Sequence, residues 1–171
     1  LKNDGVLFKL TTTSRKESQK KTFENINYES FKFSQDSFDK NFISRLVEAD
    51  HILVSIAPIS EGDIVIKKFK NYLNSKKLKW ITYLSATSVY GDHKGEWVDE
   101  KSETKPTSSN GIERLKVEKE WIDLSSKFDL PFQIFRLSGI YSNKYNILTR
   151  LKSGDVKIIN KKNHFFSRVH V

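Results

Sequence analysis

The sequence contains no cysteine, which excludes disulfide bonds, zinc–thiolate sites and cysteine nucleophiles. Histidines are also few, and none of them forms a close pair such as H-E-x-x-H. They stand at positions His51, His93, His164 and His170. We therefore predict that the protein holds no metal.

Long apolar runs are absent as well. There is no stretch of about 18 apolar residues, and no N-terminal apolar segment is flanked as in a signal peptide. A cytoplasmic protein without a membrane span is therefore the expectation. The chain begins at Leu1 rather than Met and ends at Val171 directly after an apolar and basic segment, so we expect a fragment that is cut at both ends.

Acidic residues are outnumbered, 21 against 30 Lys and Arg, which gives a formal net charge of +9. Acidic residues dilute the basic ones along most of the chain, which argues against nucleic acid as the partner. The excess gathers in residues 141–171, where one acidic residue, Asp155, stands against Lys144, Arg150, Lys152, Lys157, Lys161, Lys162 and Arg168. This segment suits either a site for an anionic ligand such as a diphosphate or a solvated basic face.

Apolar runs of strand length alternate with segments of helical periodicity, and this alternation predicts an α/β protein with a doubly wound parallel sheet. With 171 residues the chain is long enough for one domain with a substantial core. We expect strands at residues 6–12, 31–33, 51–57, 80–84 and 132–137, the third buried on both faces. Helices are expected over residues 38–50, 62–73 and 112–126, with a long loop at 85–110. In such a sheet, ligands bind beyond the carboxyl ends of the strands.

The segment YLSATSVYGD at residues 83–92 carries the most specific signal. It resembles the strand-to-loop motif with which extended short-chain dehydrogenases/reductases, of the nucleotide-sugar epimerase/dehydratase kind, place hydroxyl groups beside the nicotinamide. Further segments follow at the spacing of this family: Asp99-Glu100, Lys105-Pro106-Thr107, FRLSGIY at residues 135–141 and SRVHV at residues 167–171. The resemblance covers almost the whole chain and implies a Rossmann-type doubly wound parallel sheet with helices on both faces.

The same resemblance implies how the chain is organised. Residues 1–141 would form the NAD(P)-binding domain, and residues 142–171 would begin the substrate-binding region. The first unit of the fold, whose G-x-G-x-x-G loop cradles the pyrophosphate, would lie before Leu1. The resemblance implies a small-molecule partner, a nucleotide-sugar. It also makes a homodimer a possible assembly.

Cofactor contacts are expected at four strand ends. Thr13, Ser14 and Arg15 follow the strand where a basic residue accommodates the 2′-phosphate of NADP, so Arg15 and Lys16 favour NADP over NAD; a solvated turn is the alternative. In the resemblance, Ile56, Ala57 and Pro58 pack against the adenosine side of the cofactor, although a buried strand stopped by proline would look the same. The expected contacts to the cofactor are completed by Leu84, Ser85, Arg114 and Gly139.

The catalytic positions of the family are where this sequence departs from it. The family carries Tyr and Lys four residues apart on one helix face, and here Asn110 and Arg114 occupy those positions. Asn110 has no titratable proton, so the usual acid/base step cannot run through it, and a helix cap is its other interpretation. Arg114 could bind a ribose or phosphate, or be an exposed helix cation. Ala86 stands where the family has Ser or Thr.

Replacement groups stand beside these positions. Ser85, Thr87 and Tyr90 are candidates for the catalytic hydroxyl, and Ser88, Tyr90 and Arg168 for substrate binding. Such departures are typical of an atypical, epimerase-like branch of the family, which the segment GEWVDE at residues 95–100 resembles more closely than it resembles the standard members.

Three functions therefore remain open. The first is an NAD(P)-dependent enzyme that acts on a nucleotide-sugar or related alcohol by hydride transfer. The second is a dinucleotide-binding module without catalysis, which acts as a sensor or regulator through a partner. The third, nucleic-acid binding by the basic C-terminal segment, would leave the strand-end motifs unexplained.

Overall fold

The computed structural model describes residues 8–154, 156, 160 and 165–171. The chain folds into two compact units, Leu1–Asp50 with Asn71–Leu78, and His51–Lys70 with Lys79–Val171. Among the described residues, no helix has both the length and the apolar character needed to cross a membrane.

The first unit contains a three-stranded sheet in the order β1-β3-β2. Strand β3 pairs in parallel with β1 and antiparallel with β2. A two-residue turn joins β2 to β3, with Glu24 and Asn25 at φ 47° and 66°, the positive values that a type I′ hairpin turn requires. The strands are β1 (Thr11–Ser14), β2 (Gln19–Phe23) and β3 (Ile26–Lys32).

Helix α1 (Phe42–Glu48) belongs to the same unit. Phe31 of β3 is buried, and its ring centroid lies 5.8 Å from that of Phe42 at the start of the helix. Arg45 donates from Nε and Nη2 to the Glu29 carboxylate at 2.8 and 3.3 Å, so an ion pair also joins the helix to β3.

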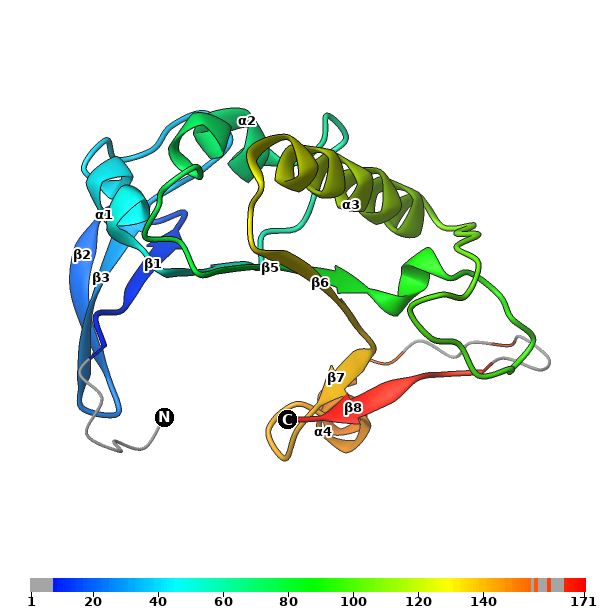
Figure 1. Cartoon of the computed structure of the whole chain (residues 1–171). Helices are drawn as coiled ribbons and strands as arrows, with labels where there is room; N and C mark the ends of the chain where they lie inside the picture. Colours follow the sequence, from blue (N-terminus) through cyan, green and yellow to red (C-terminus); the bar gives the residue numbers. More distant parts are fainter. Residues whose placement is uncertain (1–7, 155, 157–159, 161–164) are drawn as a thin grey trace. The chain divides into compact units, whose positions relative to one another are not determined.

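The second unit contains a parallel sheet in the order β4-β5-β6. Successive parallel strands step in one direction across the sheet, so right-handed crossovers place α2 and α3 on the same face of it (Figure 1). The elements are β4 (His51–Val54), α2 (Ile64–Phe69), β5 (Trp80–Ala86), the 3-10 turn η2 (Thr87–Val89), α3 (Ser109–Phe128) and β6 (Phe132–Leu137). The 3-10 turn η1 (Lys70–Tyr72) includes the last residue of this stretch of the second unit and the first two residues of the next stretch of the first unit.

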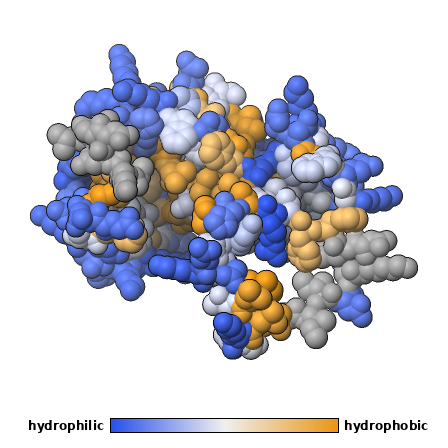
Figure 2. Space-filling model, turned by 90° about the horizontal axis from the view of Figure 1, so that it is seen from below, coloured by the Kyte–Doolittle hydropathy of each residue, from blue (hydrophilic) through white to orange (hydrophobic). Residues whose placement is uncertain are grey.

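The core of this unit lies between the sheet and these helices. Ile81 and Tyr83 of β5 are fully buried, and Trp121 of α3 stacks on Phe132 of β6 with ring centroids 5.4 Å apart. The opposite face of the sheet exposes Leu53. Figure 2, viewed from that side, shows apolar side chains gathered there.

Asp63 joins the two helices of the core. Its side chain caps α2 by accepting hydrogen bonds from the backbone N–H groups of Val65 and Ile66 at 2.6 and 2.9 Å. It also accepts from the indole Nε1 of Trp121 at 3.2 Å, so the start of α2 is tied to the middle of α3.

The C-terminal part of the second unit forms a small parallel pair of strands. Gly139 pairs with Arg168 and Tyr141 with His170 in this ladder. The elements are β7 (Gly139–Tyr141), α4 (Ile147–Lys152) and β8 (Arg168–His170).

Several expected elements differ from those observed. In the part of residues 6–12 that the structure describes, the strand starts only at Thr11, where pairing with β3 begins, and it continues to Ser14. The hairpin β2–β3 was not expected, because Glu24-Asn25 lacks the glycine that usually marks such a turn. Helix α1 starts at Phe42 rather than residue 38, because Phe38 forms a β-bridge with Phe33.

The second unit also corrects two expectations. The strand at residues 51–57 ends at Val54, and Leu53 is 59% exposed, so β4 is not buried on both faces. The loop expected at residues 85–110 begins later, because β5 continues to Ala86 and is followed by η2. Residues 132–137 form a strand as expected.

Candidate functional site

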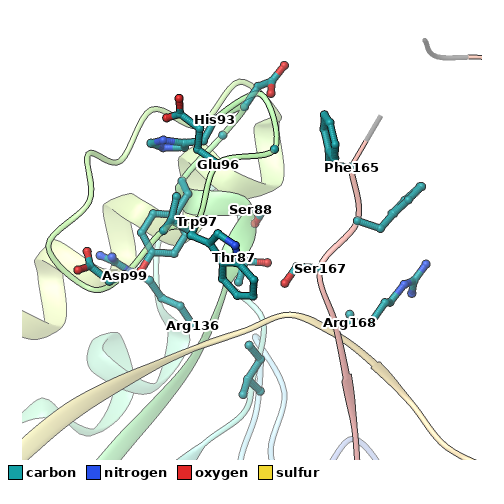
Figure 3. Close-up of a pocket in the computed structure, with 18 of the residues that line it drawn as sticks. Thr87, Ser88, His93, Glu96, Trp97, Asp99, Arg136, Phe165, Ser167 and Arg168 are labelled. Carbon is teal, nitrogen blue, oxygen red and sulfur yellow. The ribbon is translucent and has the colours of Figure 1, made fainter. Parts of the chain in front are cut away.

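A cavity of about 1410 Å³ lies beyond the carboxyl ends of β5 and β6. Ser85 pairs with Arg136 and Ala86 with Leu137, so both strands end at the same edge of the sheet. The cavity is bounded by η2, the start of α3, the loop after Tyr90 and the segment that leads into β8 (Figure 3).

Hydroxyl groups gather at the end of β5. Thr87 and Ser88 of η2 line the cavity. The Oγ atoms of Ser85 and Ser88 are buried and have no hydrogen-bond partner among the described residues. The start of α3 packs directly on this turn, because a Cβ atom at Gly111 would lie only 2.5 Å from the Ser88 carbonyl oxygen. The turn that carries Thr87 and Ser88 is therefore packed closely against the start of α3.

A buried ion pair lies next to the cavity, between β6 and α3. Arg136 of β6 donates from Nε and Nη2 to the carboxylate of Glu118, the shortest contact being 2.8 Å, and Glu118 is 1% exposed. The hydrogen bond to Glu118 raises the pKa of Arg136 above its ordinary value, so the guanidinium stays charged. Arg136 also lies over the ring of Tyr90, 4.9 Å from its centroid, which fixes that ring at the cavity wall.

Arg114 lies beneath the end of β5. Its Nη1 donates to the backbone carbonyl of Leu84 at 3.1 Å, and the side chain is half-buried. Burial raises the pKa of the neighbouring Tyr83 to about 12, while the charge of Arg114 acts in the opposite direction. Arg114 is therefore not the exposed helix cation that was one interpretation of it, and it does not line the cavity.

The loop at residues 91–105 is closed at its base and ordered by its own hydrogen bonds. The Lys105 N–H donates to the Tyr90 carbonyl at 3.2 Å, and the Glu96 N–H donates to the His93 carbonyl at 3.0 Å. After Trp97 in the sequence, the Asp99 carboxylate accepts hydrogen bonds from the Lys101 N–H at 3.0 Å and from the Ser102 hydroxyl at 2.8 Å. These hydrogen bonds lower the pKa of Asp99, and the bond from Ser102 has the largest effect.

The opposite wall comes from residues 165–168. The ring of Phe165 lies against Gly95 of the loop, since a Cβ atom there would be 2.7 Å from it. Figure 3 shows Ser167 facing Thr87 and Ser88, whereas Arg168 points away from Trp97. Arg168 lies over Gly139, where a Cβ atom would be 2.9 Å from its Nη1.

The predicted residues are therefore only partly brought together. The cavity is lined by Thr87, Ser88, Tyr90, Gly139 and Arg168. Ser85 and Leu84 lie in β5 just before it, and residues 56–58 follow β4 at the same edge of the sheet. Thr13 and Ser14 end β1 in the first unit, and the exposed Arg15 follows them.

Asn110 lies in the first turn of α3, exposed and outside the residues that line the cavity. It is not the helix cap, because the hydroxyl of Ser108 accepts the hydrogen bond from the Gly111 N–H at 3.2 Å. No cluster of three potential metal ligands occurs in the part of the chain that the structure describes.

Several residues that line the cavity were not predicted from the sequence, among them Arg136, Trp97 and Ser167, and neither was Glu118, which pairs with Arg136. Trp97 lines the cavity and is 100% exposed, and its sequence signal was an apolar residue among the acidic ones of GEWVDE. Glu118 is a buried carboxylate next to the apolar Val117 on α3, and a charge on the apolar side of a helix signals a partner.

No family model matches the chain, and no curated protein matches its sequence. Its structure is similar to that of a functionally unknown conserved protein from Silicibacter pomeroyi, at 37% identity over 71% of this chain and 43% of that one, with a TM-score of 0.63. It is also similar to UDP-glucuronic acid 4-epimerase from Bacillus cereus in complex with NAD, at 21% identity over 67% and 40% of the two chains, with a TM-score of 0.54.

A third similar structure is MoeE5 in complex with UDP-glucose and NAD, at 16% identity over 95% of this chain and 59% of that one, with a TM-score of 0.64. The chain has a Rossmann-type α/β fold. The cavity thus lies at the edge of a Rossmann-type sheet where ligands bind in such folds. The chain spans about two fifths of the length of the first two structures, 43% and 40%.

Proposed function

We propose that the protein carrying this chain is an NAD(P)-dependent epimerase, dehydratase or reductase that acts on a nucleotide-sugar or a related alcohol. The observation that carries the proposal is the hydroxyl-lined cavity at the carboxyl ends of β5 and β6 in a Rossmann-type fold. Similar structures are described as complexes with NAD, UDP-glucuronic acid and UDP-glucose, which supports this class of cofactor and substrate.

The residues at the edge of the sheet suit a nicotinamide cofactor. Ser85 has a buried hydroxyl group without a partner among the described residues, and such a group can donate to a ribose or a carboxamide. Ile56, Ala57 and Pro58 would contact the adenosine side, with Leu84 and Gly139 nearer the nicotinamide. The bound cofactor would supply hydride acceptance and donation. We propose NADP as the preferred cofactor, because the exposed Arg15 can pair with a 2′-phosphate.

Tyr90 and Thr87 are the groups we propose for the proton at the substrate. The phenol of Tyr90 can donate and accept a proton, and its ring is held by Arg136 at the cavity wall. Asn110 cannot take this part, because its amide does not titrate. Ser88 and Arg168 would contact the substrate, and residues 142–171 would begin its binding region.

A dinucleotide-binding module without catalysis is the second candidate. Arg114 bonds the Leu84 carbonyl beneath the sheet, and Asn110 is exposed outside the cavity, so neither stands where it can replace the Tyr and Lys of the family. This function predicts micromolar or tighter NADP binding without turnover.

The test is turnover by the full-length protein with NADP or NAD and a panel of UDP-sugars and alcohols. We expect interconversion or hydride exchange with at least one substrate, and a loss of about a hundredfold in kcat for Tyr90→Phe. Val98→Ala, at the cavity wall but without a proton to transfer, is the control. Cofactor binding without any turnover would instead support the module.

A further inference from the structure

Trp97 is placed in an unusual way. It is 100% exposed although tryptophan side chains are highly buried on average, and it lines the cavity. The loop that carries it is hydrogen-bonded on both sides of it, in the turn at residues 93–96 and in the turn at residues 99–102. The loop thus fixes the backbone of Trp97 while its indole packs against almost nothing in the chain.

The indole points from the loop into the cavity, in the direction of Thr87 and Ser88 (Figure 3). An apolar ring held at the wall of a cavity is the usual way in which a binding site receives a flat or ring-shaped part of a ligand.

The polar groups around Trp97 indicate which part of a ligand it would receive. The space in front of the indole is faced by Thr87 and, from the opposite wall, by Ser167 (Figure 3). Their hydroxyl groups carry no charge, and they can donate to and accept from the hydroxyl groups of a sugar.

Neither arginine of the cavity offers a free positive charge beside Trp97. The guanidinium of Arg136 is neutralised by the buried Glu118, and Arg168 points away from Trp97, over the ring of Phe166 at 5.3 Å. An anionic part of the ligand is therefore favoured near Arg168, and a neutral, hydroxylated ring is favoured on Trp97.

We propose that Trp97 is a specificity-determining residue that stacks on the sugar ring of the substrate, through the ring face that carries C–H groups. This inference rests on the proposed function and deepens it by assigning the sugar, rather than the base or the phosphates, to the loop at residues 91–105. The hydroxyl groups of the sugar meet Thr87 and Ser167.

The test compares the dissociation constants of UDP-glucose and UDP for the full-length protein, measured by titration calorimetry. Wild type binds UDP-glucose more tightly than UDP, and Trp97→Ala lowers this preference roughly three- to tenfold while leaving UDP binding unchanged. Trp97→Phe keeps most of the preference, because it retains a ring. Phe23→Ala is the matched control, since Phe23 is 64% exposed in β2 of the first unit and is not among the residues that line the cavity.

Three results would overturn the inference. If Trp97→Ala weakened the binding of UDP and UDP-glucose equally, the indole would contact the base rather than the sugar. If the variant left both dissociation constants unchanged, the indole would contact neither. If wild type bound neither ligand, there would be no sugar subsite at Trp97. Turnover of a UDP-sugar with an unchanged preference would overturn this inference and leave the proposed function intact. A preference that depends on Trp97 without turnover would support the subsite and reject the enzyme.

Discussion

Glu118 does not line the cavity, but it positions two residues that do, Arg136 and Tyr90. Its buried carboxylate holds two donors of Arg136, and Arg136 in turn holds the ring of Tyr90. Glu118 therefore positions Arg136, and Arg136 positions the ring of Tyr90. In this way a charged residue in the middle of α3 helps to fix the aromatic ring that follows η2.

Replacing Glu118 with Gln is expected to destabilise the fold by about 3 kcal/mol, because it leaves the largely buried Arg136 without its counter-charge. Denaturant unfolding measures this. The matched control is Glu61→Gln, which removes the exposed partner of Lys67 and should change the free energy of unfolding by less than about 0.5 kcal/mol. Equal effects of the two variants would show that the buried pair does not stabilise the fold.

Asp63 predicts a dependence of stability on pH. Burial raises its pKa above the ordinary 3.8, and the charge of Glu120 acts in the same direction. When the pH rises from below 3.8, the unfolded chain releases this proton first and the folded chain later, so the folded state loses stability through Asp63.

In the Asp63→Asn variant the side chain at this position cannot ionise, so the variant should not show this loss of stability at higher pH. Urea titrations at a series of pH values measure the free energy of unfolding of both proteins. The difference, wild type minus variant, should fall as the pH rises from below 3.8. A difference that rises with pH would mean that the folded structure stabilises the charged carboxylate.

The elements of the second unit are those that the sequence predicts best. Residues 132–137 combine β-branched and aromatic character after Pro131, and they form β6 within the predicted bounds. The long apolar periodicity of α3 likewise defines a helix, although its N-terminus at Ser109 depends on the cap at Ser108. The hairpin of the first unit was not predicted, because four of the five residues of β2 are polar and its turn lacks glycine.

The candidate site was predictable only where strands end. Thr87, Ser88 and Tyr90 follow directly from the end of β5, because polar residues after a buried strand lie at the ligand edge of a parallel sheet. The contact between Glu118 and Arg136 joins a helix to a strand 18 residues later, which periodicity does not specify. The role of Trp97 depends on how the whole loop folds.

Gly91 allows that loop to close. It has φ +74°, and a Cβ atom on it would lie 2.0 Å from the Lys105 carbonyl oxygen. Gly91→Ala should therefore open the base of the loop, speed amide exchange at Lys105 and destabilise the fold by about 1–3 kcal/mol. Gly154→Ala is the matched control, with φ +72° and nothing within 4 Å, and it should leave the exchange of Lys105 unchanged.

At the scale of the whole molecule, the proposed function requires a dinucleotide to bind at the edge of the Rossmann-type sheet. Structural similarity at 16–21% identity shows the fold, and the chemistry of the bound groups then depends on this chain's own residues. Those residues supply hydroxyl groups, a fixed phenol and an exposed indole around one cavity, without the Tyr and Lys pair of the family that the sequence resembles.

The most direct test of this claim is a titration of the full-length protein with NADP and NAD, in wild type and in Arg15→Glu. We predict that wild type binds NADP more tightly than NAD and that Arg15→Glu reduces this preference by about tenfold or more, because a carboxylate repels the 2′-phosphate. Lys127→Glu, which makes the same change of charge at the far end of α3, should leave both affinities unchanged. Failure of wild type to bind either dinucleotide would contradict the account.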